Sequence, residues 1–288
     1  MIRGGAGLWR RISVVAETGS TNADVAAAAQ AGEPEGLVIV AEAQSAGRGR
    51  LGRTWTAPPR SGLFFSVLLR PGANGDAVPA SRWGWLPLLA GTAVRTAVDR
   101  VTEVPVKLKW PNDLVVPPAE GDGEGDAGPS EAADSTAEPS EPTAYGLGRK
   151  LGGILVERID TPTGPAAVIG IGLNVSLRTE ELPAPHATSL ALADAATTDR
   201  DPVIRAILRE IERWYQDWTS AAGDPGASGL ASAYAASNAT IGRRVRVELP
   251  TGTAVEGLAV GIDDDGCLIV RTGDGERVFS AGDVVHLR

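Results

Sequence analysis

The sequence contains few residues of the kinds that build disulfides and metal sites. Its 288 residues include one cysteine and two histidines. The lone cysteine, Cys267, cannot form an internal disulfide, and this set cannot supply the Cys and His ligands of a structural zinc site. Because Cys267 follows an acidic turn between two expected strands, we expect it to pack inertly. The composition therefore excludes a disulfide-stapled fold and a zinc-dependent one.

Long apolar runs are also missing. No window approaches the roughly 18 apolar residues of a membrane-spanning helix, and the N-terminus lacks the apolar run of a signal peptide. With 43% hydrophobic and 22% charged residues, the chain can nevertheless bury a full core and add a small second domain. We therefore predict a soluble protein of the cytoplasm that has no membrane partner.

The net charge of −9 is concentrated in one segment. Residues 117–148 hold eight acidic and no basic side chains, so the rest of the chain is nearly balanced at 27 − 28 = −1. A segment so rich in Pro, Gly, Ser and Glu cannot bury enough apolar surface to order itself. We interpret it as a disordered acidic insert that the fold tolerates, with a regulatory or partner-binding role as the alternative.

The remaining pattern predicts an α+β protein in which helices flank one mixed sheet. Strand-like runs occupy 11–17, 36–44, 62–70, 104–116, 148–159 and 166–177, the last two pairing if the insert is only an enlarged hairpin connection. Helices are expected at 20–32, with Ser20 or Thr21 as N-cap, and at 82–101, 201–218 and 229–238. Short strands near the C-terminus predict a small β-barrel. The expected domains are 1–238 and 239–288.

The segment GRGRLGRTW, residues 47–55, carries three arginines on a glycine-rich loop between two strands. Guanidinium groups offer forked donors to an oxyanion, and glycines let the backbone approach it closely. Repulsion among the arginines predicts a loop that becomes ordered when an anion binds. A solvated basic loop or an RGG-like nucleic-acid segment is the alternative interpretation.

Two further segments place polar groups beside strands. In KWPNDL, residues 109–114, Asn112 and Asp113 follow a strand and could accept from a ligand amine or hold magnesium, although PND is also an ordinary turn. In GRKLGGILVE, residues 148–157, Lys150 enters an apolar strand beside two glycines. Its ammonium group either points at an anion in a cleft or extends to solvent.

The segment IGIGLNV, residues 169–175, superficially matches a dinucleotide-binding fingerprint. It lacks a third glycine that opens a helix, so we reject a Rossmann interpretation. Asn174 at its end could instead read the edge of an adenine base.

Together and in this order, the four motifs resemble those of the biotin protein ligases, which adenylate biotin and transfer it to a lysine of the biotin carboxyl carrier of acetyl-CoA carboxylase. The resemblance runs from Ser20 onward, the insert excepted. It implies a class II synthetase-like catalytic domain and an SH3-like C-terminal barrel. It also implies biotin and ATP as substrates, Mg2+ with ATP, and the carrier domain of a biotin-dependent carboxylase as partner.

The resemblance also implies roles for individual residues. The implied catalytic residues are Arg48, Arg50, Lys150 and Asp113, of which Asp113 either orients the acceptor amine or binds magnesium. The implied biotin site consists of Ser20, Thr21, Asn22, Gln44, Gly47, Arg48, Gly49, Arg50, Lys150, Gly153 and Gly170. The implied ATP and adenylate contacts are Trp55, Asn112, Asn174 and Arg288.

Two other functions remain open at this point. A lipoate ligase would use the same adenylation chemistry, and a non-catalytic nucleic-acid-binding protein could use the basic loop with the small barrel. The near-neutral balance outside the insert disfavours the latter. Because the first strand starts near Arg11, we expect no N-terminal DNA-binding domain of the kind found in many relatives, and no DNA partner. The oligomeric state stays open, a homodimer included.

Overall fold

The structure is a computed structural model that describes residues 7–72, 78–118, 148–249 and 252–287. Its larger sheet has seven strands in the order β1-β2-β3-β7-β6-β5-β4, in which only β1 and β2 are parallel neighbours. The strands are β1 (Arg11–Val15), β2 (Leu37–Ala41), β3 (Gly62–Leu69), β4 (Lys107–Lys109), β5 (Asp113–Val116), β6 (Arg149–Thr161) and β7 (Gly164–Asn174). The expected mixed sheet is confirmed, and β6 and β7 pair as predicted.

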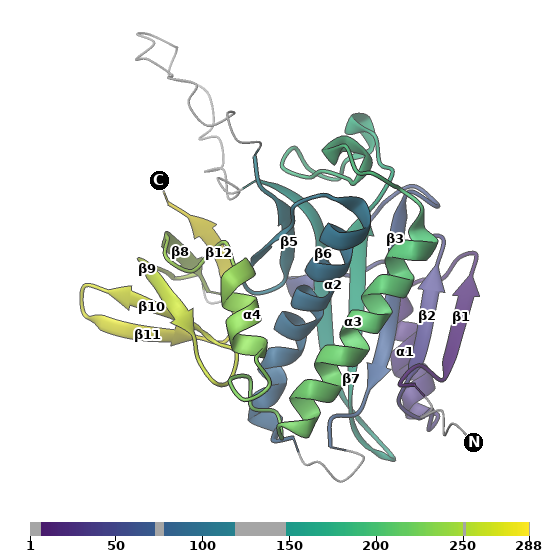
Figure 1. Cartoon of the computed structure of the whole chain (residues 1–288), viewed down its shortest axis with the longest axis horizontal. Helices are drawn as coiled ribbons and strands as arrows, with labels where there is room; N and C mark the ends of the chain where they lie inside the picture. The colour runs from purple at the N-terminus through teal and green to yellow at the C-terminus, as the bar shows by residue number, and fades with distance from the viewer. Residues whose placement is uncertain (1–6, 73–77, 119–147, 250–251, 288) are drawn as a thin grey trace.

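Four α-helices flank the two sheets among the described residues: α1 (Thr21–Gln30), α2 (Leu86–Thr102), α3 (Arg200–Ser220) and α4 (Leu230–Ser237). The long helices α2 and α3 lie side by side over one face of the large sheet, and α1 lies behind it (Figure 1). The main core fills the α2 and α3 face, whereas a small cluster that includes Val25 and Leu37 lies under α1. The sheet is therefore covered unevenly, and part of the α1 face is left for a pocket.

Strand alternation decides which residues face that pocket. In β7, Ile169 and Ile171 belong to the core under α2 and α3. Successive residues of a strand point to opposite faces, so Gly170 lies on the α1 face. The same alternation on β6 buries Ile154 in the main core and puts Leu155 on the α1 face.

Local signals fix the start of two helices. Of the two predicted residues, Ser20 occupies the N-cap position of α1, although its side chain makes no capping hydrogen bond, and Gly32 just beyond the end adopts φ +91°, a conformation that glycine takes without strain. The helix expected from residue 82 begins differently. A 3-10 helix, η2 (Ala80–Trp85), precedes α2, and Pro87 lies in the first turn of α2, where its missing N–H is not needed.

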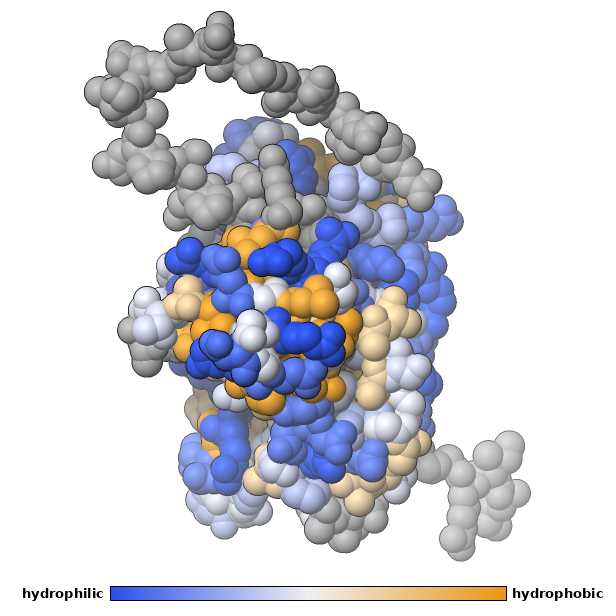
Figure 2. Space-filling model, turned by 90° about the vertical axis from the view of Figure 1, so that its left-hand side faces the viewer, coloured by the Kyte–Doolittle hydropathy of each residue, from blue (hydrophilic) through white to orange (hydrophobic). Residues whose placement is uncertain are grey.

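The C-terminal strands form a five-stranded antiparallel sheet. The strands β8 (Arg244–Glu248), β9 (Ala254–Ile262), β10 (Leu268–Thr272), β11 (Gly275–Phe279) and β12 (Asp283–His286) are ordered β11-β10-β9-β8-β12. The expected small C-terminal β-domain is confirmed as an antiparallel sheet. Over the described residues β11 and β12 are not paired with each other, so its closure into a barrel stays a prediction. Figure 2 shows this end of the molecule, where apolar residues are interspersed with hydrophilic ones.

The small sheet is joined to the rest of the fold through its β9–β10 turn and through its apolar face. The indole N–H of Trp110 donates to the carbonyl of Gly266 (3.2 Å), and that of Trp85 donates to the carbonyl of Asp264 (2.9 Å). Apolar residues of the small sheet, such as Val245, belong to the same core cluster as α2 and α3. The two sheets thus share one continuous core, which holds β12 beside the pocket described below.

Most of the acidic insert, 119–147, lies outside the described residues. Its two ends meet, because Val116 of β5 is paired with Arg149 of β6. Over the described part of the chain, no helix is long and apolar enough to span a bilayer.

Candidate active site

A pocket of about 780 Å3 opens on the α1 face of the large sheet, between the arginine loop and β12. Its walls include 14 of the residues singled out from the sequence: Ser20, Thr21, Asn22, Gln44, Arg48, Gly49, Arg50, Trp55, Asn112, Asp113, Lys150, Gly153, Gly170 and Asn174. Gly47 lines a neighbouring hollow on the other side of the loop, and Arg288 falls outside the described residues. The fold therefore brings four separate motifs to one cavity.

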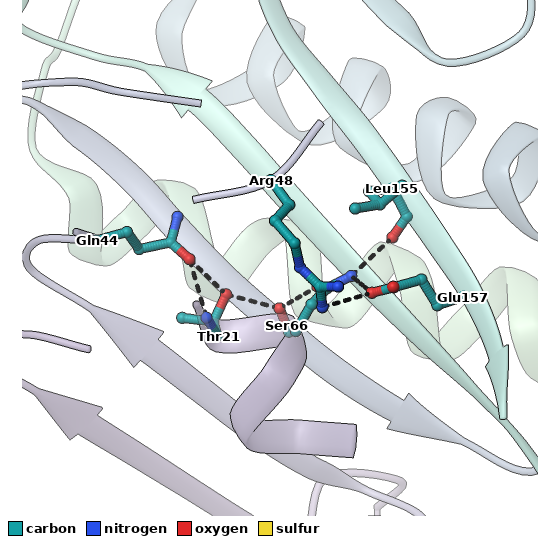
Figure 3. A network of polar contacts seen from close by, with 7 residues as sticks. Thr21, Gln44, Arg48, Ser66, Leu155 and Glu157 are labelled. Carbon is teal, nitrogen blue, oxygen red and sulfur yellow. Dashed lines mark hydrogen bonds and ion pairs between the residues drawn. The ribbon is translucent and has the colours of Figure 1, made fainter. Parts of the chain in front are cut away.

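The N-terminal end of α1 forms a polar corner of the pocket. The backbone N–H and hydroxyl of Thr21 both donate to Oε1 of Gln44, at 2.9 and 3.2 Å. The first N–H groups of a helix lack partners within it, so Gln44 satisfies one of them. Ser66 of β3 donates to Oδ1 of Asn22 (2.6 Å) and lies 2.7 Å from the Thr21 hydroxyl. Figure 3 shows this network, whose amides and hydroxyls suit a small neutral polar group.

Glycines of β6 and β7 form a flat floor beside this corner. Gly153 and Gly172 are paired across the two strands, as are Leu155 and Gly170. A Cβ at Gly170 would lie 2.1 Å from Oδ1 of Asn22, and one at Gly172 would lie 2.9 Å from the indole of Trp55. Only glycine leaves room for these neighbours, so the Asn22 amide and the Trp55 ring can lie directly on the floor.

Trp55, at the end of the arginine loop, lies over this floor. Its ring is 3.4 Å from the position of a Cβ at Gly153, and its indole N–H is buried without a hydrogen-bond partner among the described residues. The ammonium group of Lys150 lies 5.9 Å from the ring centroid. Trp55 thus covers the floor with an apolar ring. Its indole N–H is a donor that has no partner among the described residues, and the ammonium group of Lys150 lies beside the ring.

Lys150 and Asp113 form an ion pair in the middle of the pocket. Nζ of Lys150 lies 2.6 Å from Oδ1 of Asp113, and both side chains are mostly buried. Asp113 is fixed because it begins β5, opposite Gly153 of β6. Asn112, just before it, donates to the carbonyl of Ile154 (2.9 Å). The turn of KWPNDL is therefore anchored to β6, and its carboxylate holds the lysine over the floor.

Each arginine of the loop contacts a different element. Arg48 pairs with Glu157 of β6 (3.2 Å), and Arg50 donates to Oδ1 of Asn112 (3.1 Å). Arg53 forms an ion pair with Asp283 of β12, which ties the loop to the C-terminal sheet. These contacts hold the loop against β6, the KWPNDL turn and β12, and the loop includes the short 3-10 helix η1 (Arg50–Gly52). Its ordering by an anion stays a prediction.

The pocket is electropositive. Five basic side chains line it against three acidic ones: Arg48, Arg50, Arg53, Lys109 and Lys150 against Asp113, Glu248 and Asp283. Burial lowers the pKa of Lys109, although Asp113 opposes this, and burial likewise lowers the pKa of Arg50 against Asp283 and Asp113. Desolvated cations are stabilised by a nearby negative charge. The pocket therefore favours an anionic ligand.

Asn174 lies at the far end of the floor, at the C-terminus of β7. It is almost fully buried, and its Nδ2 donates to the carbonyl of Thr188 (2.9 Å), which fixes the orientation of the amide. Its place on the pocket wall is compatible with the predicted contact to adenine.

The carboxylates in the pocket suit a magnesium ion that is bound to the substrate, but not one that the protein holds by itself. Asp113 already pairs with Lys150, and among the described residues no group of three or more His, Cys, Asp or Glu side chains could hold an ion. Magnesium commonly binds one or two carboxylates together with substrate phosphates and water. Asp113 fits such a role better than that of a resident metal centre.

The residues that were not singled out from the sequence include Lys109, Gly172 and Asp283 on the pocket wall and Glu157 on the neighbouring hollow. Alternation on β6 from Gly153 could have indicated Glu157, and the motif KWPNDL itself begins with Lys109. No local signal marks Asp283, because its contact with Arg53 spans 230 positions.

Comparison with known proteins agrees with this architecture. Residues 16–174 match the biotin/lipoate A/B protein ligase family, and residues 240–287 match the biotin protein ligase C-terminal domain. The first match covers more than half of the chain. The protein therefore belongs to the biotin/lipoate A/B protein ligase family.

Two relatives and one solved structure show how far the similarity extends along the chain. The chain is 41% identical to the biotin–acetyl-CoA-carboxylase ligase of Mycobacterium tuberculosis over 100% of its own length and 93% of the relative's. It is 31% identical to the bifunctional ligase/repressor BirA of Bacillus subtilis, matching 86% of this chain and 66% of that protein. In fold it is similar to the biotin protein ligase of Aquifex aeolicus in complex with biotin and ATP, with a TM-score of 0.68, 24% identity and coverage of 97% and 100%.

Proposed function

We propose that this protein is an ATP-dependent biotin–acetyl-CoA-carboxylase ligase, which forms biotinyl-5'-AMP and transfers biotin to a lysine of a carrier domain. The observation that carries the proposal is the single pocket in which a polar corner, a glycine floor and a cluster of cations meet. Biotin has a matching neutral ureido group, a flat ring system and a carboxylate. The relative in Mycobacterium tuberculosis carries this name and matches the whole chain.

In the first step, a carboxylate oxygen of biotin attacks the α-phosphorus of ATP and pyrophosphate leaves. Two anions must approach each other, so cations that offset their repulsion lower the barrier. Arg48, Arg50 and Lys150 are the side chains proposed for this role. Magnesium bound to ATP adds positive charge at the phosphates, and Asp113 is the proposed protein ligand.

The biotin ring is proposed to lie on Gly153 and Gly170, with its ureido group toward Ser20, Thr21, Asn22 and Gln44. Gly47 and Gly49 let the loop backbone approach the ligand. The nucleotide is proposed to contact Trp55, Asn112, Asn174 and Arg288. The adenylate is a mixed anhydride that water hydrolyses, so a loop covering it also protects it.

In the second step, the neutral amine of the carrier lysine attacks the anhydride carbonyl and AMP leaves. Asp113 is proposed to orient this amine once the adenylate has formed. The homodimer and the absence of DNA binding stay predictions, as does the division into domains at residue 238.

The experiment is incubation with biotin, ATP, magnesium and an apo carrier domain, followed by streptavidin detection. We expect a labelled carrier and no label when ATP is left out. A parallel reaction with lipoate separates the two activities that the family name covers. Modification with lipoate but not biotin would refute the proposal, as would the absence of any labelled carrier.

A further inference from the structure

Glu157 is a charged residue beside the pocket that the proposed reaction leaves without a role. It lies on β6, two residues beyond Leu155 and four beyond Gly153, so its side chain leaves the same face of the sheet as the glycine floor. Its side chain is 32% exposed. An acidic group at the edge of an electropositive pocket for an anionic substrate requires an explanation.

The contacts of Glu157 join two parts of the site. Its Oε2 accepts from Nδ2 of Asn22 at 2.7 Å and from Nη2 of Arg48 at 3.2 Å. Asn22 is 4% exposed and lies in the polar corner, whereas Arg48 belongs to the loop. A single carboxylate oxygen thus connects the proposed ureido site with the arginine loop.

The carboxylate also decides which way the Asn22 amide points. Its two neighbours on one side, Glu157 and the carbonyl of Leu155 (3.4 Å), can only accept hydrogen bonds. The amide nitrogen must therefore face them, because a flipped amide would set its oxygen against a carboxylate. The amide oxygen then faces Ser66 and the floor at Gly170, where it is available as an acceptor.

The same contacts close a chain of hydrogen bonds that begins and ends near the loop. It starts at Gln44, which accepts from the backbone N–H of Thr21, and continues through the Thr21 hydroxyl, 2.7 Å from Oγ of Ser66. Asn22 accepts from Ser66 and donates to Glu157, which returns the chain to the loop at Arg48 (Figure 3). Gln44 and Arg48 are four positions apart in the sequence. A ligand that moves the Asn22 amide would therefore shift the base of the loop.

We propose that Glu157 is a positioning residue: it fixes the Asn22 amide as an acceptor for the ureido N–H groups and couples that amide to Arg48. This inference rests on the proposed function. The two contacts of Glu157 should contribute differently to biotin affinity and to the position of the loop. The bond to buried Asn22 is charge-assisted and carries the affinity, whereas the half-exposed pair with Arg48 adds little stability and acts on the loop.

The test compares Glu157→Ala, which removes both contacts, with Glu157→Gln, whose carbonyl oxygen can still accept from Asn22. We expect Glu157→Ala to raise the Kd of biotin, measured by calorimetry, at least tenfold. Its kcat for adenylation at saturating biotin and ATP should stay within threefold of the wild type. Glu157→Gln should keep the Kd within fivefold, yet release biotinyl-adenylate at least threefold faster, because it no longer holds the charge of Arg48.

The control is Asp160→Asn on the same strand, which breaks a more exposed ion pair with Arg158, and neither residue lines the pocket. It should change neither the Kd nor the release rate. An unchanged biotin Kd in Glu157→Ala would overturn the proposal, and so would equal losses of affinity in the Ala and Gln variants. If Glu157→Ala does not fold, the release rate of Glu157→Gln decides. A wild-type protein that binds no biotin would instead refute the proposed function.

Discussion

Replacing Gly170 with alanine tests the geometry of the floor most directly. Gly170 lies between Ser66 and Leu155 in the sheet, and its backbone conformation is one that alanine can adopt. The obstacle is steric, because the added Cβ would lie 2.1 Å from Oδ1 of Asn22. The amide oxygen would have to move by about 1.3 Å, from 2.1 Å to roughly 3.4 Å, to reach an ordinary contact distance.

A shift of that size breaks the bonds that hold Asn22. Its contacts with Ser66 (2.6 Å) and Glu157 (2.7 Å) are both short, and Asn22 is buried. One neutral bond and one charged bond contribute together about 2–4 kcal/mol. That loss lowers the free energy of unfolding. If the same amide binds the ureido group, its displacement also leaves a buried ureido N–H without an acceptor, which costs about 1–3 kcal/mol and raises the Kd of biotin roughly 5-fold to 150-fold.

Calorimetry with biotin and urea unfolding together measure the two effects. The control is Gly261→Ala, because Gly261 also lies within a strand, β9, and a Cβ there meets nothing within 4 Å. We expect the control to keep the wild-type Kd and stability. In an Asn22→Ala background, Gly170→Ala should change the biotin Kd and the stability much less than it does in the wild type, because the Asn22 oxygen with which the new Cβ clashes is absent.

The result that would refute the reasoning is a folded Gly170→Ala variant whose biotin Kd stays within threefold of the wild type. In that case Asn22 would not be part of the biotin site, or the floor would be able to move. An additive double mutant would likewise show that the two residues do not interact.

The remaining predictions concern the loop, the insert and pH. Arg50→Ala should release biotinyl-adenylate at least tenfold faster, as followed by label on non-carrier proteins, and an unchanged dissociation rate would count against the loop's protective role. Deleting 119–145 should leave kcat within threefold, because Val116 and Arg149 are already paired; a large loss would refute the spacer interpretation. Burial lowers the pKa of His286 from 6.5 to about 4. The unfolded chain therefore takes up a proton first as the pH falls, and stability is lost between pH 6.5 and 4, by about 2 kcal/mol at pH 5. Urea unfolding of His286→Gln should lack this loss, and equal pH dependence in both proteins would contradict it.

Comparison of expectation with structure shows which signals were reliable. The helix at 20–32 was predicted because a capping residue and a terminal glycine act within the segment itself. The small C-terminal β-domain was also predicted, because short strands separated by turn residues are local features, but these features do not say whether the sheet is open or closed. Whether two edge strands meet depends on how the sheet curls, which no single segment encodes.

The sequence by itself determined the strands, the helices and the four motifs, because periodicity, caps and glycine placement are properties of neighbouring residues. It did not determine that Arg53 meets Asp283 or that Asn22 meets Glu157, pairs that are 230 and 135 positions apart. Those meetings follow from strand order, from the face of the sheet that α2 and α3 leave open, and from the shared core that holds β12 beside the loop. Contacts between distant segments form only when the whole core packs. These contacts determine which charged and polar groups line the pocket.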